Sequence, residues 1–274
     1  MRRLDRRGEA ALFAVLVLGI GLASSLLGGR FVEPYGWIPL AAAVVVVLLT
    51  GRARSRTAWS GFAVRWAGFA AWIPAIAIPG VVLTAGYVAA WAFGAVKLGL
   101  DGISVPVYAG MTIVILVGAS IEAIGEEVGW RGFLLPRLAG LGRVRAGFIG
   151  GLLWAAWHTP LIYVAGAYHG GADPLFMVPF TITIVAMGFI ANELRIASGS
   201  SWPAVVFHGA HNGIWFQLQV LVVGSTGALG AIGGESGLVP MTLYVLVAVW
   251  IVARRPAWTG ASDVRLGEHH AHGG

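Results

Sequence analysis

Long apolar stretches recur along the whole chain and are separated by short polar segments. A helix needs about 20 mostly apolar residues to cross the hydrocarbon core of a bilayer, because each residue rises only about 1.5 Å and no backbone group can stay unpaired in lipid. We therefore predict an all-α fold, a polytopic bundle of about eight transmembrane helices. The predicted spans cover residues 9–28, 36–51, 70–96, 105–124, 146–164, 175–192, 202–223 and 238–253.

The basic residues fall almost entirely on one side of these predicted spans. If the N-terminus is cytoplasmic, 16 of the 18 Lys and Arg residues lie in cytoplasmic segments, and only Arg30 and Lys97 lie on the other side. Lys and Arg favour the cytoplasmic side of a membrane, so both termini are predicted to be cytoplasmic. The first apolar stretch is longer than the usual 7–15 residues of a secretory signal, which favours an uncleaved first helix.

Composition supports a membrane protein. Hydrophobic residues make up 58% of the 274 residues and charged residues 11%, whereas soluble domains average about 45–50% and about 25%. A soluble globular enzyme is therefore excluded. The net charge of +6 is explained by the membrane topology, so no nucleic-acid partner is predicted. We expect a multi-pass protein of the plasma (inner) membrane whose partners are the lipid bilayer and a membrane-associated peptide or protein.

Two further counts narrow the chemistry and the source. The chain has no cysteine, which excludes a thiolate nucleophile and a Cys-ligated metal. It has 17 arginines and a single lysine, Lys97, which indicates a GC-rich bacterial genome.

Carboxylates cluster at the end of the fourth predicted span. Glu122, Glu126 and Glu127 lie within six positions, although the whole chain has only 12 acidic residues. Glu127 and Arg131 are four residues apart and can form an ion pair on one helix face. Glu122 and Glu126 share another face, where two close carboxylates favour general acid or base chemistry.

Imidazole and amide side chains stand in two later spans. His158 follows Trp154 by one helical turn in the fifth span, and His208 and Asn212 share a face of the seventh, with His211 pointing elsewhere. Each group alone has a structural interpretation, as a helix-packing hydrogen bond or, for Glu127, an architectural ion pair. Their occurrence together in three consecutive spans favours one buried site inside the bundle.

Such a site can perform more than one chemistry. A carboxylate and an imidazole can take a proton from water, and a second imidazole with an amide can stabilise an oxyanion. This set suffices for peptide-bond hydrolysis. Two histidines and a carboxylate could instead hold Zn2+, although no HExxH motif is present. A proton relay in a transporter is a third possibility, which the lack of an internal repeat weakens.

Three short motifs together resemble those of the CAAX protease and bacteriocin-processing enzyme (CPBP) family of intramembrane proteases, whose members carry an ABI domain. The family pattern EExxxR is matched by Glu126 to Arg131. The pattern FxxxH is matched by Trp154 to His158, with Trp in place of the usual Phe, and HxxxN by His208 to Asn212. The resemblance covers residues 104–225, with residues 1–103 as variable N-terminal helices and 226–274 as a last helix and a polar cytoplasmic tail.

The resemblance implies a role for each matched residue. Glu126 would be the general base, and His158 would help to polarise the attacking water. His208 and Asn212 would stabilise the oxyanion, while Glu127 and Arg131 would support the site. The family has been described both as metal-dependent and as glutamate-dependent. We expect a mechanism without a cofactor, with zinc as the alternative.

The resemblance also sets the expected function. Eukaryotic relatives cut after a prenylated cysteine, whereas many bacterial relatives resemble processing or immunity proteins. We expect an endopeptidase that acts on a membrane-associated peptide or protein. The alternative is a non-catalytic immunity or peptide-binding protein of the same fold. The Gly-rich segment 224–237 is predicted to be a flexible linker, and the histidines of the tail, His269, His270 and His272, to be disordered.

Overall fold

A computed structural model describes residues 4–27, 35–52, 59, 62, 69–166 and 176–254. The polar tail with its histidines lies outside the described residues, as do several basic residues on which the predicted orientation depends. These basic residues are Arg2, Arg3, Arg30, Arg54, Arg56, Arg65, Arg255 and Arg265. The predicted orientation of the spans stays a prediction.

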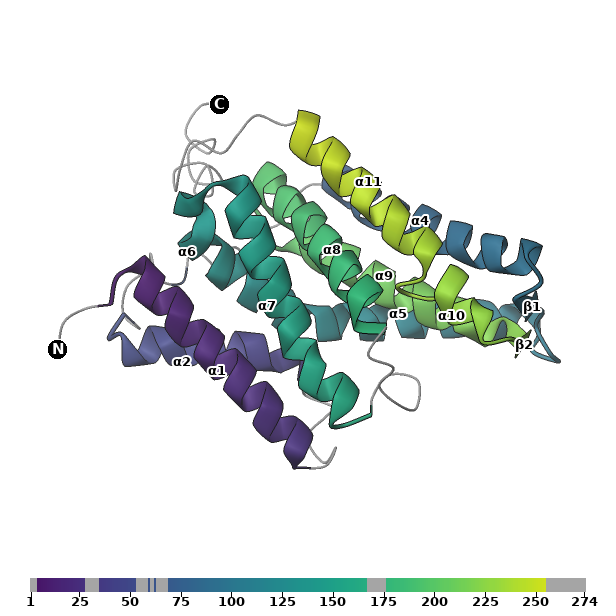
Figure 1. The fold of residues 1–274 in the computed structure, drawn as a ribbon, viewed down its shortest axis with the longest axis horizontal. Coiled ribbons are helices and arrows are strands. Elements are labelled where there is room, and N and C mark those ends of the chain that lie inside the picture. Colours follow the sequence, from purple (N-terminus) through teal and green to yellow (C-terminus); the bar gives the residue numbers. More distant parts are fainter. Residues whose placement is uncertain are drawn as a thin grey trace.

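Each of the predicted spans coincides with a helix, and the described residues form an all-α membrane bundle with a single small sheet (Figure 1). The main helices are α1 (Arg6–Leu26), α2 (Ile38–Leu49), α4 (Trp72–Ala92), α5 (Val105–Glu127), α7 (Arg143–Tyr163), α8 (Met177–Ser198), α9 (Trp202–Val220) and α11 (Leu238–Arg254). Shorter helical segments are η1 (Tyr35–Trp37), η2 (Phe69–Ala71), η3 (Val128–Leu134), α6 (Leu135–Leu138), η4 (Ala139–Leu141) and α10 (Ala228–Ile232).

Four of the described helices are long and apolar enough to cross a membrane. They span Arg6–Leu26, Phe69–Ala92, Val105–Leu141 and Met177–Ser198. Tyr35–Leu49 and Leu238–Arg254 are apolar but shorter. The helices α7 and α9 carry the predicted histidines, and their mean hydropathy is lower than that of these four spans. Polar side chains inside a membrane bundle are costly and often functional, which makes these two helices the natural place to look for a site.

The helices pack in a way that places α9 near the centre of the bundle. α9 contacts α5, α4 and α8. α7 lies against α8 and α1, and α11 lies against α8 and α4. One hydrophobic core includes Phe13 of α1, whose ring centroid lies 5.4 Å from that of Trp130 and 5.3 Å from that of Phe133. The core therefore continues across the predicted boundary at residues 103 and 104.

The prediction of a flexible linker at 224–237 is wrong. Strand β2 (Val222–Ser225) pairs antiparallel with β1 (Val96–Leu98), and α10 follows directly (Figure 1). The segment then packs closely on α4, because a Cβ atom at Gly233 would meet the backbone of Gly86. The many glycines allow this close backbone approach, so they indicate tight packing here where the composition suggested flexibility.

Close backbone contact also fixes the end of α5. A Cβ atom at Gly125 would lie 2.5 Å from the carbonyl oxygen of Gly36 and 2.6 Å from the Cα of Trp37. Four residues later, a Cβ at Gly129 would lie 2.5 Å from the Cβ of Pro39. Only glycine fits at these two positions, so η1 and α2 press directly against the helix segment that carries the predicted carboxylates.

The Gly125→Ala variant should therefore be less stable than the wild type. Forcing a methyl group into a filled contact costs about 1–3 kcal/mol in free energy of unfolding. The matched control is Gly118→Ala on the same helix, where a Cβ meets nothing within 4 Å. Alanine loses less conformational entropy on folding than glycine does. The free energy of unfolding of this control should therefore equal that of the wild type or exceed it by about 0.5–1 kcal/mol. Denaturant unfolding in detergent micelles measures both, and equal stability of the two variants would contradict the close contact.

Candidate active site

A cavity of about 270 Å3 lies where η1, α5, α7, α8 and α9 meet. The four residues predicted to be catalytic, Glu126, His158, His208 and Asn212, all line it. The other lining residues are Tyr35, Gly36, Ala119, Glu122, Trp154, Trp157, Leu161, Ile184, Met187, His211, Phe216 and Glu235. The structure thus brings the predicted residues together from three helices, while their catalytic roles stay a prediction.

The paired carboxylates stand where α5 changes its helical winding. α5 ends at Glu127 and continues without a break into η3, a π-helix in which all residues are buried. A π-helix has i→i+5 hydrogen bonds and is frequent at functional sites. Successive residues of a helix point in directions about 100° apart, so Glu126 and Glu127 face different neighbours. Glu126 lines the cavity, and Glu127 does not.

Glu127 is the centre of a buried polar cluster behind the cavity wall. Its side chain is 0% exposed, and its Oε1 accepts a hydrogen bond of 2.8 Å from Nη1 of Arg131. The same oxygen lies 3.0 Å from Nδ1 of His208 on α9. The predicted ion pair between Glu127 and Arg131 is confirmed. Glu127 also orients the imidazole of His208, a contact that helical spacing alone did not reveal.

Glu126 is held by the tryptophan that departs from the usual family pattern. Nε1 of Trp154 donates a hydrogen bond of 2.7 Å to Oε2 of Glu126. The guanidinium carbon of Arg131 lies 4.3 Å from the centroid of the Trp154 ring, a cation–π contact on its face. A phenylalanine in place of Trp154 could make the ring contact but could not donate this hydrogen bond.

The two cavity histidines are oriented through their Nδ1 atoms. Nδ1 of His158 lies 2.9 Å from the carbonyl oxygen of Trp154. A carbonyl oxygen only accepts hydrogen bonds, so Nδ1 carries the proton and Nε2 of a neutral His158 keeps its lone pair. Nε2 of His208 lies 3.2 Å from Nδ2 of Asn212, which confirms that these two share a face of α9.

A second polar group on the cavity wall was missed by the sequence analysis. Nδ1 of His211 lies 2.7 Å from Oη of Tyr244 on α11, and its Nε2 lies 3.3 Å from Oε1 of Glu235. His211 and Glu235 both line the cavity. Glu235 stands in the segment interpreted as a linker. The signal that could have found Glu235 was its charge, because it is one of only 12 acidic residues in an apolar chain.

Aromatic side chains from η1 and α7 close another part of the cavity wall. The rings of Tyr35 and Trp157 stack with centroids 4.5 Å apart, and Oη of Tyr35 donates a hydrogen bond of 2.8 Å to the carbonyl oxygen of Trp157. Trp157 and Phe180 both make edge contacts with the ring of His158. These contacts restrict the rotation of the imidazole. The segment η1 contributes to the cavity although the resemblance covered only residues 104–225.

The cavity does not present a ready set of metal ligands. Across the described ranges of the chain, no group of three or more His, Asp or Glu side chains is placed to hold a metal ion. Both nitrogens of His208 already have partners, Glu127 at Nδ1 and Asn212 at Nε2. The geometry of these described residues thus does not fit a zinc centre.

Known proteins match the central part of the chain. The family described as "Type II CAAX prenyl endopeptidase Rce1-like" matches residues 108–214, which include Glu126, His158, His208 and Asn212. A curated relative, CAAX prenyl protease 2 of Methanococcus maripaludis, is 29% identical over 93 residues. That alignment covers 32% of this chain and 34% of the relative, so the chain spans about a third of the length of the relative it matches.

Removal of Arg131 should strongly destabilise the fold. The Arg131→Met variant leaves the carboxylate of Glu127 buried without its main partner, which costs about 3–5 kcal/mol. The Glu127→Gln/Arg131→Met double variant should lose less than the sum of the two single variants, because it removes both charges. Exposed Arg145 is the control, and Arg145→Met should stay within about 0.5 kcal/mol of wild type. Unfolding in detergent checks the cycle, and additive losses would contradict coupling of the pair.

Proposed function

We propose that this chain, whose residues 108–214 match the Rce1-like family, is an intramembrane endopeptidase. It hydrolyses a peptide bond in a membrane-associated peptide or protein. One observation carries the proposal, namely that Glu126, His158, His208 and Asn212 reach one cavity from three different helices. A carboxylate, two imidazoles and an amide around about 270 Å3 of space are sufficient to activate water and bind an oxyanion.

Glu126 is proposed as the general base. Its Oε2 is engaged by Trp154, which leaves Oε1 to accept a proton from water in the cavity. Nε2 of His158 keeps a lone pair and can accept the second hydrogen of the same water. The water oxygen then attacks the carbonyl carbon of the substrate as its proton passes to Glu126. Glu126 returns that proton to the nitrogen of the leaving amine when the C–N bond breaks.

His208 and Asn212 are proposed to stabilise the oxyanion. His208 gives its Nδ1 proton to Glu127, so its Nε2 accepts the hydrogen bond from Nδ2 of Asn212. Once a proton reaches Nε2, this atom would donate to the developing charge in exchange for its contact with Asn212. The amide of Asn212 would supply a second donor next to it. Loss of one donor of this kind typically lowers kcat by about 100- to 1,000-fold in enzymes with an oxyanion hole.

The cavity is also placed for a substrate that comes from the membrane. Glu122 and Phe216 line the cavity and are exposed, so the cavity reaches the surface at α5 and α9. Along most of α5 the large apolar side chains are exposed, as a helix facing lipid requires. We propose that the substrate is a peptide segment in the plasma membrane of a bacterium. The relative is named a prenyl protease, whereas our proposal for this chain covers peptide-bond hydrolysis alone.

The Glu126→Gln and His158→Ala variants should lose hydrolysis. Without the base, the water has no proton acceptor, and we expect turnover to fall by at least 100-fold. Membrane peptides from cells that carry wild-type or Glu126→Gln protein are compared by mass spectrometry, and a peptide found this way is then tested with purified enzyme. Asp101→Asn, a carboxylate-to-amide change at an exposed residue in the turn before α5, is the control and should retain activity.

Three outcomes would contradict this proposal. If both variants keep wild-type turnover, the assigned roles are wrong. If the wild type cleaves nothing and its cellular phenotype persists when all four cavity residues are changed to alanine, the protein is a binder. If a stoichiometric Zn2+ survives purification and is lost together with activity in His158→Ala, the chemistry belongs to a metal.

Trp154→Phe should lower activity, although phenylalanine is the usual residue of the family pattern. The variant keeps an aromatic ring but removes the hydrogen bond that orients Glu126. The matched control is Trp157→Phe, because Nε1 of Trp157 has no hydrogen-bond partner in the described structure. We expect kcat to fall about tenfold or more in Trp154→Phe and clearly less in Trp157→Phe, since a hydrogen bond to a charged group contributes about 1.5–3 kcal/mol. Equal losses would assign Trp154 a packing role only.

A further inference from the structure

A second and larger hollow lies away from the candidate active site. It has a volume of about 720 Å3 and lies between α1, the segment from η3 to η4, and α7. We call it the basic groove, and it is defined by Asp5, Arg6, Arg7, Ala10, Ala11, Ala14, Leu134, Arg137, Leu138, Gly140, Leu141, Ile149 and Leu153. Its volume is in the range of about 300–1,000 Å3 that is usual for small-molecule sites. It shares no residue with the cavity described above.

The groove has one basic end and one apolar end. Arg6 and Arg7 stand at the start of α1, where both side chains are exposed. Ala10 and Ala14 follow one and two turns further along the same helix, and Leu153 stands more than two turns inside α7. Because a helix rises about 1.5 Å per residue, the lining changes from cationic to apolar over roughly 12 Å. A phospholipid has the same order of groups, a charged headgroup followed by acyl chains.

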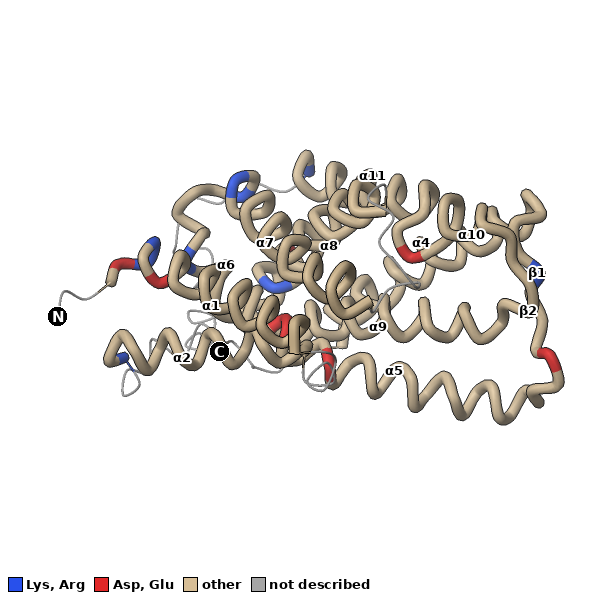
Figure 2. Tube along the Cα trace, turned by 60° about the horizontal axis from the view of Figure 1, so that its bottom comes forward, with Lys and Arg blue, Asp and Glu red and all other residues tan. Residues whose placement is uncertain are grey.

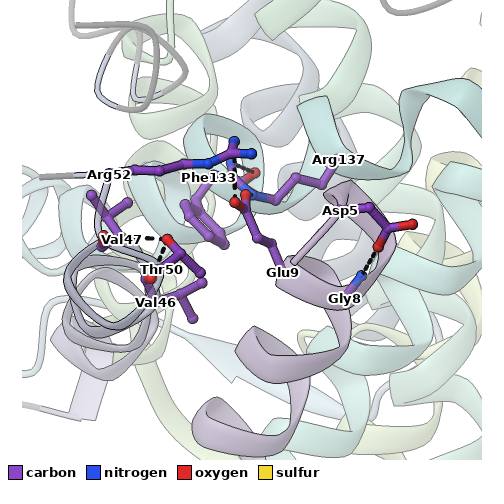
Figure 3. A network of polar contacts seen from close by, with 9 residues as sticks. All are labelled: Asp5, Gly8, Glu9, Val46, Val47, Thr50, Arg52, Phe133 and Arg137. Atoms are coloured by element: carbon purple, nitrogen blue, oxygen red, sulfur yellow. Dashed lines mark hydrogen bonds and ion pairs between the residues drawn. The ribbon is translucent and has the colours of Figure 1, made fainter. Parts of the chain in front are cut away.

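A buried carboxylate fixes the basic end (Figure 3). Glu9 is 1% exposed, and it lies 2.8 Å from Nε of Arg137 and 3.1 Å from Nη1 of Arg52. Nη1 of Arg137 also donates a hydrogen bond of 2.8 Å to the carbonyl oxygen of Phe133, and neither bond uses Nη2. Glu9 therefore holds Arg137 rigidly in the wall of the groove. Binding of a ligand then costs little side-chain entropy at Arg137, because this side chain is already ordered.

The charge at this end is positive after all of these pairs are counted. Among the described residues at this end, two carboxylates, Asp5 and Glu9, are outnumbered by four arginines, namely Arg6, Arg7, Arg52 and Arg137. Oδ1 of Asp5 is used as the cap of α1, where it accepts the N–H of Gly8 at 2.8 Å. Figure 2 shows the same concentration of basic positions near the start of α1, the end of α2 and α6. Basic pockets between helices at one side of a membrane bind anionic headgroups.

The apolar end exists because α1 presents small side chains here. Ala10, Ala11 and Ala14 line the groove, whereas larger side chains on the neighbouring face of α1, such as Phe13 and Val17, fill the core. Leu138 and Ile149 form the opposite apolar wall. In a membrane, space beside such a wall is occupied by acyl chain, since it excludes water.

We propose that the basic groove binds one anionic phospholipid, with the headgroup phosphate at Arg6, Arg7 and Arg137 and an acyl chain along Ala10 and Ala14. Such a lipid would connect α1 to the segment that follows the paired carboxylates. This inference is independent of the proposed peptidase activity, because it rests on residues outside the cavity.

The test measures lipid binding to the full-length protein purified in detergent. Phosphatidylglycerol and phosphatidylcholine with identical acyl chains are titrated separately, and bound lipid is counted by native mass spectrometry. We expect one tightly bound phosphatidylglycerol per chain and much weaker binding of phosphatidylcholine. The Arg6→Gln/Arg7→Gln variant should bind phosphatidylglycerol roughly thirty-fold more weakly, the loss expected for two arginines near an anionic headgroup. The control is Arg145→Gln/Arg254→Gln, which removes the same charge from exposed residues outside the groove.

A second pair of variants tests the apolar end. Ala14→Phe fills the groove and should also weaken phosphatidylglycerol binding, whereas Val15→Phe changes a neighbouring exposed residue outside the groove and should not. Both variants keep every arginine, so a selective effect of Ala14→Phe cannot come from charge. The thermal unfolding midpoint without lipid shows whether each variant is folded.

Four results would overturn the proposal. Equal binding of phosphatidylcholine would remove the role of headgroup charge. Equal losses in the two double-arginine variants would indicate attraction by the overall charge alone. Release of the lipid by millimolar inorganic phosphate would assign the site to a free anion. Unchanged binding in Ala14→Phe would show that no acyl chain enters the groove. None of these results depends on whether the protein cleaves a peptide.

Discussion

The burial of Glu127 is the constraint on which the arrangement of the site depends. A carboxylate that is 0% exposed inside a membrane bundle must be paired, because an unpaired buried charge is strongly destabilising. One of its oxygens serves both Arg131 and His208, so the pairing fixes the winding of η3 and the rotation of α9 together. Arg131 in turn lies on the face of Trp154, which holds Glu126. The cavity side chains are thus positioned by a group that does not itself reach the cavity.

Backbone packing supplies the second condition, because electrostatic pairs alone would not place α5. The glycine contacts at Gly125 and Gly129 bring η1 and α2 against the segment that carries the carboxylates, and Tyr35 of η1 then stacks on Trp157. The N-terminal helices are therefore part of the site, although they lie outside residues 108–214 that match the Rce1-like family. In a bilayer, where apolar surfaces gain little by association, small residues that permit close backbone contact are a main source of helix packing.

The sequence predicted the helices and four of the polar side chains that line the cavity, and the rest of the wall could not be predicted for physical reasons. The spans followed from apolar length, and the pairs of Glu127 with Arg131 and of His208 with Asn212 followed from helical spacing. The contact of His208 with Glu127 joins residues 81 positions apart, which no periodicity encodes. Glu235 was missed because a Gly-rich segment was interpreted as flexible, whereas its glycines permit close packing on α4. The amino-acid composition carries no signal for the π-helical winding of η3.

The arginines after α5 also have a structural role that their side of the membrane does not explain. Arg131 and Arg143 are buried and Arg137 is half-buried, and each is paired with a buried glutamate, namely Glu127, Glu193 and Glu9 in that order. The three glutamates belong to α5, α8 and α1, so this short stretch is fixed to three separate helices. Breaking any of these pairs would leave a buried charge, which typically costs about 3–5 kcal/mol. The positive charge that predicts the orientation of the chain therefore also holds the connection between the carboxylate helix and the histidine helix α7 in place.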